Sequence, residues 1–148
     1  MKISSKGRYA LASMILLSQN VQEGSLLTVI GISGRLNISK IYLEQVFALL
    51  RRGGLVTSIK GSQGGYQLAR AASEISAADI LCVTENAVFE PVESTVAEVE
   101  PGIERALRDS LWEPANKAFY EVFEQMSLAD LAEEALRKSA ADGYMYCI

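Results

Sequence analysis

The sequence predicts a mostly α-helical protein with one small β-hairpin and a long C-terminal helix, and three observations support this. Over residues 5–52, apolar side chains recur every three or four positions, which is the spacing of one helix face. Over residues 55–70 the period changes to two, which is typical of paired strands. From Pro101 the helical spacing returns and continues for about 25 residues.

The first helix is expected over residues 5–20. Ser4 or Ser5 would be its N-cap, because a serine hydroxyl can accept a hydrogen bond from a free N–H group of the first turn. Asn20 and Glu23-Gly24 would end the helix. The residues expected on its buried side are Ala10, Met14 and Leu17.

Two further helices are expected before residue 55. The shorter one covers residues 28–36, and it needs support from its neighbours because each of its two glycines costs about 1 kcal/mol relative to alanine. After the turn residue Asn37, the next helix has Ser39 as its N-cap and ends at Gly53-Gly54. The residues expected to face the core from these two helices are Val29, Ile32, Leu36, Leu43, Val46, Phe47 and Leu50.

Residues 55–60 and 65–70 predict two short strands, and the glycines between them are typical of a hairpin turn. A helix-turn-helix followed by such a hairpin describes a winged helix, in which the second helix of the helix-turn-helix lies in the major groove of DNA. Residues 76–85 predict one more amphipathic helix, whose apolar residues include Ile80, Leu81 and Val83.

The apolar stripe that begins at Pro101 is too long for a small domain to cover by itself. We therefore expect a dimerisation helix that pairs with its copy in a second subunit. Pro114 has no N–H group and its ring clashes with the preceding turn, so a kink or break is expected near Asp109–Glu113. Ser127 would cap a last short helix, Leu128–Lys138. The residues expected at the dimer interface are Ile103, Leu107, Leu111, Phe119, Val122 and Met126.

These elements divide the chain into four expected parts. Residues 1–85 form a winged-helix DNA-binding domain. Residues 86–100, which are acidic, contain proline and show no period, form a linker. Residues 101–138 form the dimerisation helix and the short packing helix, and residues 139–148 form a C-terminal tail.

Charge is divided unevenly between the two halves of the chain. Residues 1–70 contain nine Lys or Arg and two acidic residues, a net charge of +7, whereas residues 71–148 contain five and sixteen, a net charge of −11. A basic half is suited to phosphate contact, and an acidic half is repelled by it, so the N-terminal half is expected to face nucleic acid. The alternative is that the division only reflects solvated surfaces.

Other classes of protein fit the sequence poorly. The chain has no histidine to act as a general base and no nucleophile or phosphate-loop motif, so we expect no enzyme. With two cysteines and no histidine, a structural metal site or a disulfide framework is not expected. No apolar run reaches the roughly 18 residues of a membrane span, and Met1–Lys6 does not resemble a signal peptide, so a cytoplasmic protein is expected.

Several motifs resemble the Rrf2 family of winged-helix transcription regulators, nearly from end to end. Residues 1–10 (MKISSKGRYA) are similar to the opening of the family, and residues 42–45 (YLEQ) to its recognition helix. Residues 61–68 (GSQGGYQL), together with Glu74-Ile75, resemble its wing. The resemblance implies a homodimer bound to double-stranded DNA at a pseudo-palindromic site.

One departure from the family decides which branch the chain resembles. Family members that bind an iron–sulfur cluster have three cysteines between the fourth helix and the long helix, whereas residues 86–105 contain none. Such a cluster needs thiolate or comparable ligands, so no cofactor is expected. The chain is more similar to the cluster-free branch, which includes repressors of cysteine metabolism, chiefly through its ending, residues 143–148 (GYMYCI).

Candidate DNA contacts lie on the predicted third helix and the wing. Glu44 can accept a hydrogen bond from cytosine N4 while it repels phosphate, which gives it a role in specificity, and Gln45 can bind adenine or a phosphate. Lys60 would lie over the minor groove. Many members of the family that the chain resembles have arginine at this position. Alternatively, Glu44 and Gln45 are only solvated and the glycines only form a turn. The expected DNA-binding residues are Ser5, Lys6, Arg8, Ser39, Lys40, Tyr42, Glu44, Gln45, Arg51, Lys60, Gly61 and Gly64.

The tail suggests a protein partner. Cysteine-metabolism repressors of this family resemble serine acetyltransferases in ending with isoleucine, which implies binding to cysteine synthase (O-acetylserine thiol-lyase). The residues expected to bind it are Tyr144, Met145, Tyr146 and Ile148. The alternative is an ordinary terminus packed on its neighbour or free in solution.

Two other functions remain open. The chain could be a redox-sensing repressor that uses Cys147, in a tail where a thiol is accessible, or Cys82, which the apolar run at 80–83 predicts to be a small core residue. It could also be a protein-interaction module that does not bind DNA.

Overall fold

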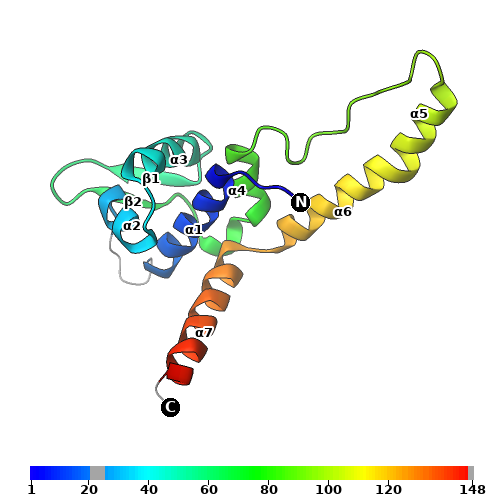
Figure 1. Cartoon of the computed structure of the whole chain (residues 1–148). Helices are drawn as coiled ribbons and strands as arrows, with labels where there is room; N and C mark the ends of the chain where they lie inside the picture. The colour runs from blue at the N-terminus through cyan, green and yellow to red at the C-terminus, as the bar shows by residue number, and fades with distance from the viewer. Residues whose placement is uncertain (21–25, 147–148) are drawn as a thin grey trace.

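The computed structural model describes residues 1–20 and 26–146, with side chains described up to Gly143. A group of short helices and a hairpin forms one end of the molecule, and a long helix and an extended linker reach away from it (Figure 1). The expected helix end at Glu23-Gly24 lies outside the described residues, as do the predictions for Cys147 and Ile148.

The N-terminal elements confirm the predicted winged helix. They are the helices α1 (Ser5–Asn20), α2 (Val29–Leu36) and α3 (Lys40–Arg52), and the antiparallel strands β1 (Val56–Ile59) and β2 (Gly65–Leu68). In the hairpin, Val56 pairs with Leu68 and Ile59 with Gly65. Leu27 adds a short bridge to Tyr66 of β2 through two backbone hydrogen bonds.

Local signals in the sequence begin and end these helices. The Ser4 hydroxyl accepts a hydrogen bond from the Gly7 N–H, so Ser4 caps α1. The Thr28 side chain caps α2, and Asn37 ends it in the left-handed conformation that asparagine tolerates. Ser39 caps α3 by accepting a hydrogen bond from the Tyr42 N–H. Each cap satisfies a backbone group that a helix end leaves free.

The hydrophobic core lies where α1, α2, α3 and the hairpin meet. Nearly all of the residues predicted to face the core are there, and Val29 and Leu36 pack against its edge. The fully buried side chains include Met14, Ile32, Leu43, Val46, Phe47, Leu50, Leu55, Val56, Ile75, Ile80, Leu81 and Leu128.

Helix α4 (Ala77–Thr84) packs on α1 and α3 and is capped by Ser76 in a capping box with Asp79. Of its predicted apolar residues, Ile80 and Leu81 are buried and Val83 is half-buried, and Ala77, Ala78 and Thr84 complete the buried side. The prediction that Cys82 is a core residue is wrong, because Cys82 is exposed. An apolar run of four residues in a helix must turn one of its members outward, since successive side chains are about 100° apart.

The long helix has three segments. Helix α5 (Pro101–Leu107) leads into a π-helical segment, Arg108–Trp112, and α6 (Glu113–Gln125) continues from it. The irregularity falls where Pro114 predicts a kink or break, and it takes the form of a wider turn without interrupting the helix (Figure 1). The wider turn accommodates Pro114, which cannot donate the usual backbone hydrogen bond.

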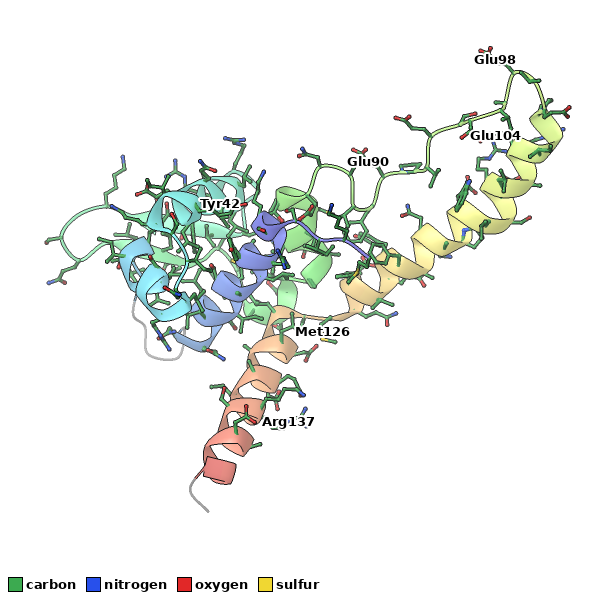
Figure 2. All side chains as sticks on the ribbon, in the orientation of Figure 1. Tyr42, Glu90, Glu98, Glu104, Met126 and Arg137 are labelled. Carbon is green, nitrogen blue, oxygen red and sulfur yellow. The ribbon has the colours of Figure 1, made fainter. Side chains whose placement is uncertain are left out.

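The linker is fixed to the long helix at two points. Glu104 is buried, and its carboxylate accepts hydrogen bonds from the backbone N–H groups of Thr95 and Val96, at 3.1 and 2.9 Å. The Asn116 amide donates to the carbonyl oxygen of Phe89 at 3.0 Å. In Figure 2 the Glu104 side chain lies near the far end of the long helix, beside the linker. The linker has turns but no helix or strand, as predicted.

After α6 the chain returns to the winged helix. The Met126 carbonyl accepts a hydrogen bond from the Ala77 N–H, and the Leu128 N–H donates to the Ile75 carbonyl. Helix α7 then runs from Leu128 to Tyr146. Ser127 caps it as predicted, but the predicted end at Lys138 is wrong, and the backbone of the expected tail is helical up to Tyr146.

Helix α7 continues because residues 139–142 contain only Ser, Ala and Asp, none of which breaks a helix. Gly143, which lies inside the helix, does not end it. The first turns of α7 pack on α1, and its last turns project from the molecule (Figure 1). Among residues 1–20 and 26–146, no helix has both the length and the apolar character needed to cross a membrane.

Candidate nucleic-acid interface

Helix α3 presents a polar face on the side opposite its buried residues. Ser39 and Lys40 lie at its N-terminal end, and Glu44 and Gln45 follow one turn later, all of them exposed. Tyr42 is half-buried on the side of α3 near α1 (Figure 2). The predicted base-reading residues therefore lie together at the end of α3 that a helix-turn-helix inserts into the major groove.

Glu44 forms an ion pair within α3. Its carboxylate lies 3.6 Å from the Lys40 ammonium group, and both side chains are 54% exposed. An exposed pair of this kind contributes little to stability, so either partner can turn toward another group at small cost. In the free protein Lys40 offsets the negative charge that Glu44 would otherwise present to phosphate.

The start of α1 lies beside α3. The ring of Tyr9 packs edge-to-face on Tyr42, with centroids 5.2 Å apart. The Arg8 guanidinium donates to the Ser5 hydroxyl at 3.0 Å and is exposed, and Lys6 is half-buried. These groups are at the edge of the α3 face, where side chains of a helix-turn-helix protein contact the DNA backbone.

The hairpin turn places its functional residues at the tip of the wing. Lys60 directly follows β1 and is exposed. Gly61 has a φ of 116°, which other residues rarely adopt. A Cβ atom at Gly64 would lie 2.1 Å from the Ile59 carbonyl oxygen, so only glycine fits there. The two glycines are thus required by the turn itself, whether or not they also approach phosphate.

A hollow of about 360 Å³ lies between α3 and the wing, lined by Ala48, Arg51, Arg52 and Tyr66. Arg51 is held there by a 3.2 Å hydrogen bond to the Ser58 hydroxyl of β1. Two guanidinium groups beside a hollow are suited to bind a phosphate. Sequence reasoning did not select Tyr66, because only the fold brings the end of α3 next to β2.

The predicted dimerisation stripe is largely uncovered in the single chain. Ile103, Leu111, Val122 and Met126 are exposed, whereas Leu107 and Phe119 are half-buried. The stripe runs along α5 and α6, which extend outward from the winged helix (Figure 1). An apolar stripe of this length on a protein surface is typical of an interface with another chain.

An aromatic cluster that the sequence did not predict explains the partial burial of Phe119. Phe89 of the linker lies 5.6 Å from Phe119, 5.1 Å from Tyr120 and 5.7 Å from Phe123, measured between ring centroids. The sequence does place the three α6 aromatics within about one helix turn of one another. No feature of the sequence pairs them with Phe89. The cluster attaches the linker to α6.

The structure does not favour Cys82 as a redox site. Partial burial of its sulfur raises the pKa of the Cys82 thiol, and the negative charge of Asp79 raises it further. Because the thiolate is the reactive form, a raised pKa makes Cys82 less reactive. Cys147 lies outside the described residues, and so does Ile148 of the expected partner-binding tail. The backbone of Tyr144, Met145 and Tyr146 is part of α7.

Comparisons with known proteins agree with this geometry. The family model Rrf2, described as an iron-dependent transcriptional regulator, matches residues 3–134. The chain is 35% identical over 146 residues to the HTH-type transcriptional regulator IscR of Cereibacter sphaeroides, covering 95% of this chain and 93% of that protein. These relatives are transcription regulators and not enzymes.

Two solved structures share the fold over almost the whole chain. CymR, the global cysteine regulator of B. subtilis, is 39% identical with a TM-score of 0.76, covering 90% of this chain and 98% of its own. IscR of T. potens is 36% identical with a TM-score of 0.74, covering 99% of this chain and 96% of its own. The chain belongs to the Rrf2 family of winged-helix, DNA-binding transcription regulators.

Proposed function

We propose that the chain is a homodimeric repressor that binds a pseudo-palindromic site in double-stranded DNA in the cytoplasm. The observation that carries this proposal is the exposed face of α3, which is polar and lies beside the basic start of α1 and the wing. In each subunit, α3 would lie in the major groove and Lys60 of the wing over the adjacent minor groove. Ser5, Lys6, Arg8, Tyr42 and Arg51 would contact phosphates, which fix the position of the protein without reading the sequence.

The dimer would form along α5 and α6. Pairing two copies of the exposed stripe removes its apolar side chains from water, and the symmetry of the pair then sets the distance between the two α3 helices. This arrangement requires a two-fold-related DNA site, because each subunit contacts an equivalent half-site.

The dimer can be tested by placing a charge on the stripe. Leu111→Glu is expected to give a monomer in sedimentation experiments and to weaken DNA binding, because a buried unpaired carboxylate opposes association. Leu136→Glu on α7 is a matched control, since Leu136 is 57% exposed and Leu111 is 48% exposed. The control is expected to remain a dimer. A monomeric unmodified chain, or a dimeric Leu111→Glu, would contradict the proposed interface.

DNA binding itself is tested by selection of bound fragments from genomic DNA. We expect the unmodified chain to retain a small set of related, two-fold symmetric sequences. A folded chain that retains no duplex at low salt would instead be a protein-interaction module.

An iron–sulfur cluster, which the description of the family implies, does not fit the residues of this chain. A cluster is held by four cysteines or by a combination with histidine, and the chain has two cysteines and no histidine. Cys82 is on α4, and the linker and α5 contain neither residue type. In the part of the chain that the structure describes, no three residues of the metal-binding types come together. We therefore propose a regulator that works without a cluster.

We further propose that the chain regulates cysteine metabolism and that residues Tyr144–Ile148 bind cysteine synthase. The similarity to CymR, which is a cysteine regulator, and the sequence of these residues support this. Calorimetry with cysteine synthase is expected to show binding by the unmodified chain and by Lys138→Ala, which changes an exposed α7 residue upstream. Deletion of Ile148 is expected to abolish binding, and unchanged affinity would contradict the proposal.

A further inference from the structure

Ile41 is an apolar residue at the centre of the face that α3 would present to DNA. It is the second residue of α3, and its side chain leaves the residue 71% exposed. Successive residues of an α-helix are about 100° apart around the axis, so Leu50, nine positions later, lies about 180° from Ile41. Leu50 is fully buried. Ile41 therefore points directly away from the core.

The neighbours of Ile41 on this face make a narrow apolar strip between polar groups. Ala48, seven positions later, differs from Ile41 by only about 20° around the axis, and it is also exposed. Gln45 lies on one side of the strip, and the Lys40–Glu44 ion pair lies on the other. Ala48 lies about 10.5 Å farther along the helix axis, so the two residues are separate apolar points on this strip.

The major groove offers one apolar group to such a strip. Thymine carries a methyl group at C5, whereas the other bases present hydrogen-bond donors and acceptors at their major-groove edges. A side chain that cannot form hydrogen bonds is favoured against the methyl group and disfavoured against polar groups that would lose water without a replacement partner.

We propose that Ile41 is a specificity-determining residue that contacts the C5 methyl group of a thymine in each half-site. This inference rests on the proposed binding of double-stranded DNA by α3. The polar neighbours Glu44 and Gln45 would contact the adjoining base pairs, since they lie on either side of the strip. The preference for thymine at this position is then set by an apolar contact, and not by a hydrogen bond.

Deoxyuridine tests this contact because it differs from thymidine only by the C5 methyl group. The unmodified full chain is first used to select a duplex from a randomised library, and each dT of that duplex is then replaced in turn by dU. At one thymine in each half-site the affinity is expected to fall about fourfold, because burial of one methyl group contributes about that factor. In Ile41→Ala and Ile41→Ser, the same replacement is expected to leave the affinity unchanged.

Ile30→Ala provides the matched control. Ile30 is on α2 and is 67% exposed, so it loses the same atoms from a similarly exposed site outside α3. This variant is expected to keep the fourfold loss. The inference is overturned if the unmodified chain binds its selected duplex but no dU replacement weakens binding, or if Ile41→Ala shows the same loss as the unmodified chain. If the unmodified chain selects no duplex, the proposed DNA binding fails first, and the inference fails with it.

Discussion

Glu44 has an unusual charge for a residue on a DNA-facing helix. Its carboxylate would repel phosphate, but the Lys40 ammonium group 3.6 Å away offsets that charge in the free protein. A carboxylate in the major groove can accept a hydrogen bond from cytosine N4. It cannot form one with a base edge that carries only acceptors. At the scale of single residues, its expected role is therefore to discriminate between bases.

We predict that Glu44→Ala changes base preference more than overall affinity. Loss of the carboxylate removes one specific contact, worth about 1–3 kcal/mol of discrimination against the wrong base, and it also removes a repulsive charge. The measurement is a gel-shift titration of both proteins against a library of sites. Uniform weakening with the same order of preferred sites would show that Glu44 does not read a base.

Glu104 has a structural role that depends on its charge. Hydrogen bonds from the backbone N–H groups of Val96 and Thr95 lower the pKa of the Glu104 carboxyl from its ordinary value of 4.5. A lowered pKa means that folding favours the charged form. The resulting stability is complete above the ordinary pKa and is lost as the pH falls through the lower pKa of the folded state.

We predict that Glu104→Gln releases the linker at neutral pH. Hydrogen exchange at the amides of Thr95 and Val96 is expected to be faster in the variant at pH 7, because an amide oxygen is a weaker acceptor than a carboxylate. As the pH falls below 4.5, the difference in protection is expected to shrink as Glu104 becomes protonated. A difference that stays constant with pH would contradict this account.

At the scale of elements, the wing depends on a turn that only glycine can form. A Cβ atom at Gly64 would lie 2.1 Å from the Ile59 carbonyl oxygen and 3.0 Å from that of Gly61. Both neighbours are backbone atoms of the hairpin itself and cannot move without changing its shape. The turn thereby fixes the position of Lys60 relative to α3.

We predict that Gly64→Ala destabilises the protein by about 1–3 kcal/mol, as overpacking of a close contact does. The measurement is unfolding in denaturant. Gly34→Ala is the control, because a Cβ atom at Gly34 of α2 meets nothing within 4 Å. That variant is expected to be more stable by about 0.5–1 kcal/mol, since alanine is the better helix former. Equal effects of the two substitutions would contradict the packing argument.

At the scale of the whole molecule, the basic and acidic halves of the sequence occupy different parts of the structure. Residues 1–70, with a net charge of +7, include the whole of α3 and the wing. Most of the acidic residues lie on the linker, the long helix and α7, which extend away from that part (Figure 1). The acidic part therefore lies where its repulsion of the DNA backbone is weakest, because repulsion falls with distance and is screened by salt.

We predict a steep dependence of DNA binding on salt. Each phosphate that the protein neutralises releases counterions, and log K falls with log salt by about 0.9 per contact. Between about 50 and 200 mM salt, six phosphate contacts would lower the affinity about a thousandfold. Arg51→Ala is expected to reduce the slope by about 1 for each phosphate lost. A flat response would exclude phosphate contacts as the main source of affinity.

Much of the fold could be predicted because its signals are local. Helix periodicity, the caps Ser39 and Ser127, and the glycine-rich turn each depend on neighbouring residues, and the structure contains all of them. Pro114 indicated where the long helix changes its geometry, although not that the change is a π-helical turn. The small residues after Lys138 were a poor guide to the end of α7, because Ser, Ala and Asp do not break a helix.

By itself, the sequence determined the winged helix, the basic half and the polar face of α3, because these follow from the order of residues along short segments. Only the tertiary structure decided which distant groups meet. It placed Arg52 beside Tyr66, Phe89 among the aromatics of α6, and Glu104 at the backbone of the linker. It also turned Cys82 outward. The physical reason is that contacts between segments far apart in the chain depend on how whole elements pack, and no local pattern encodes that packing.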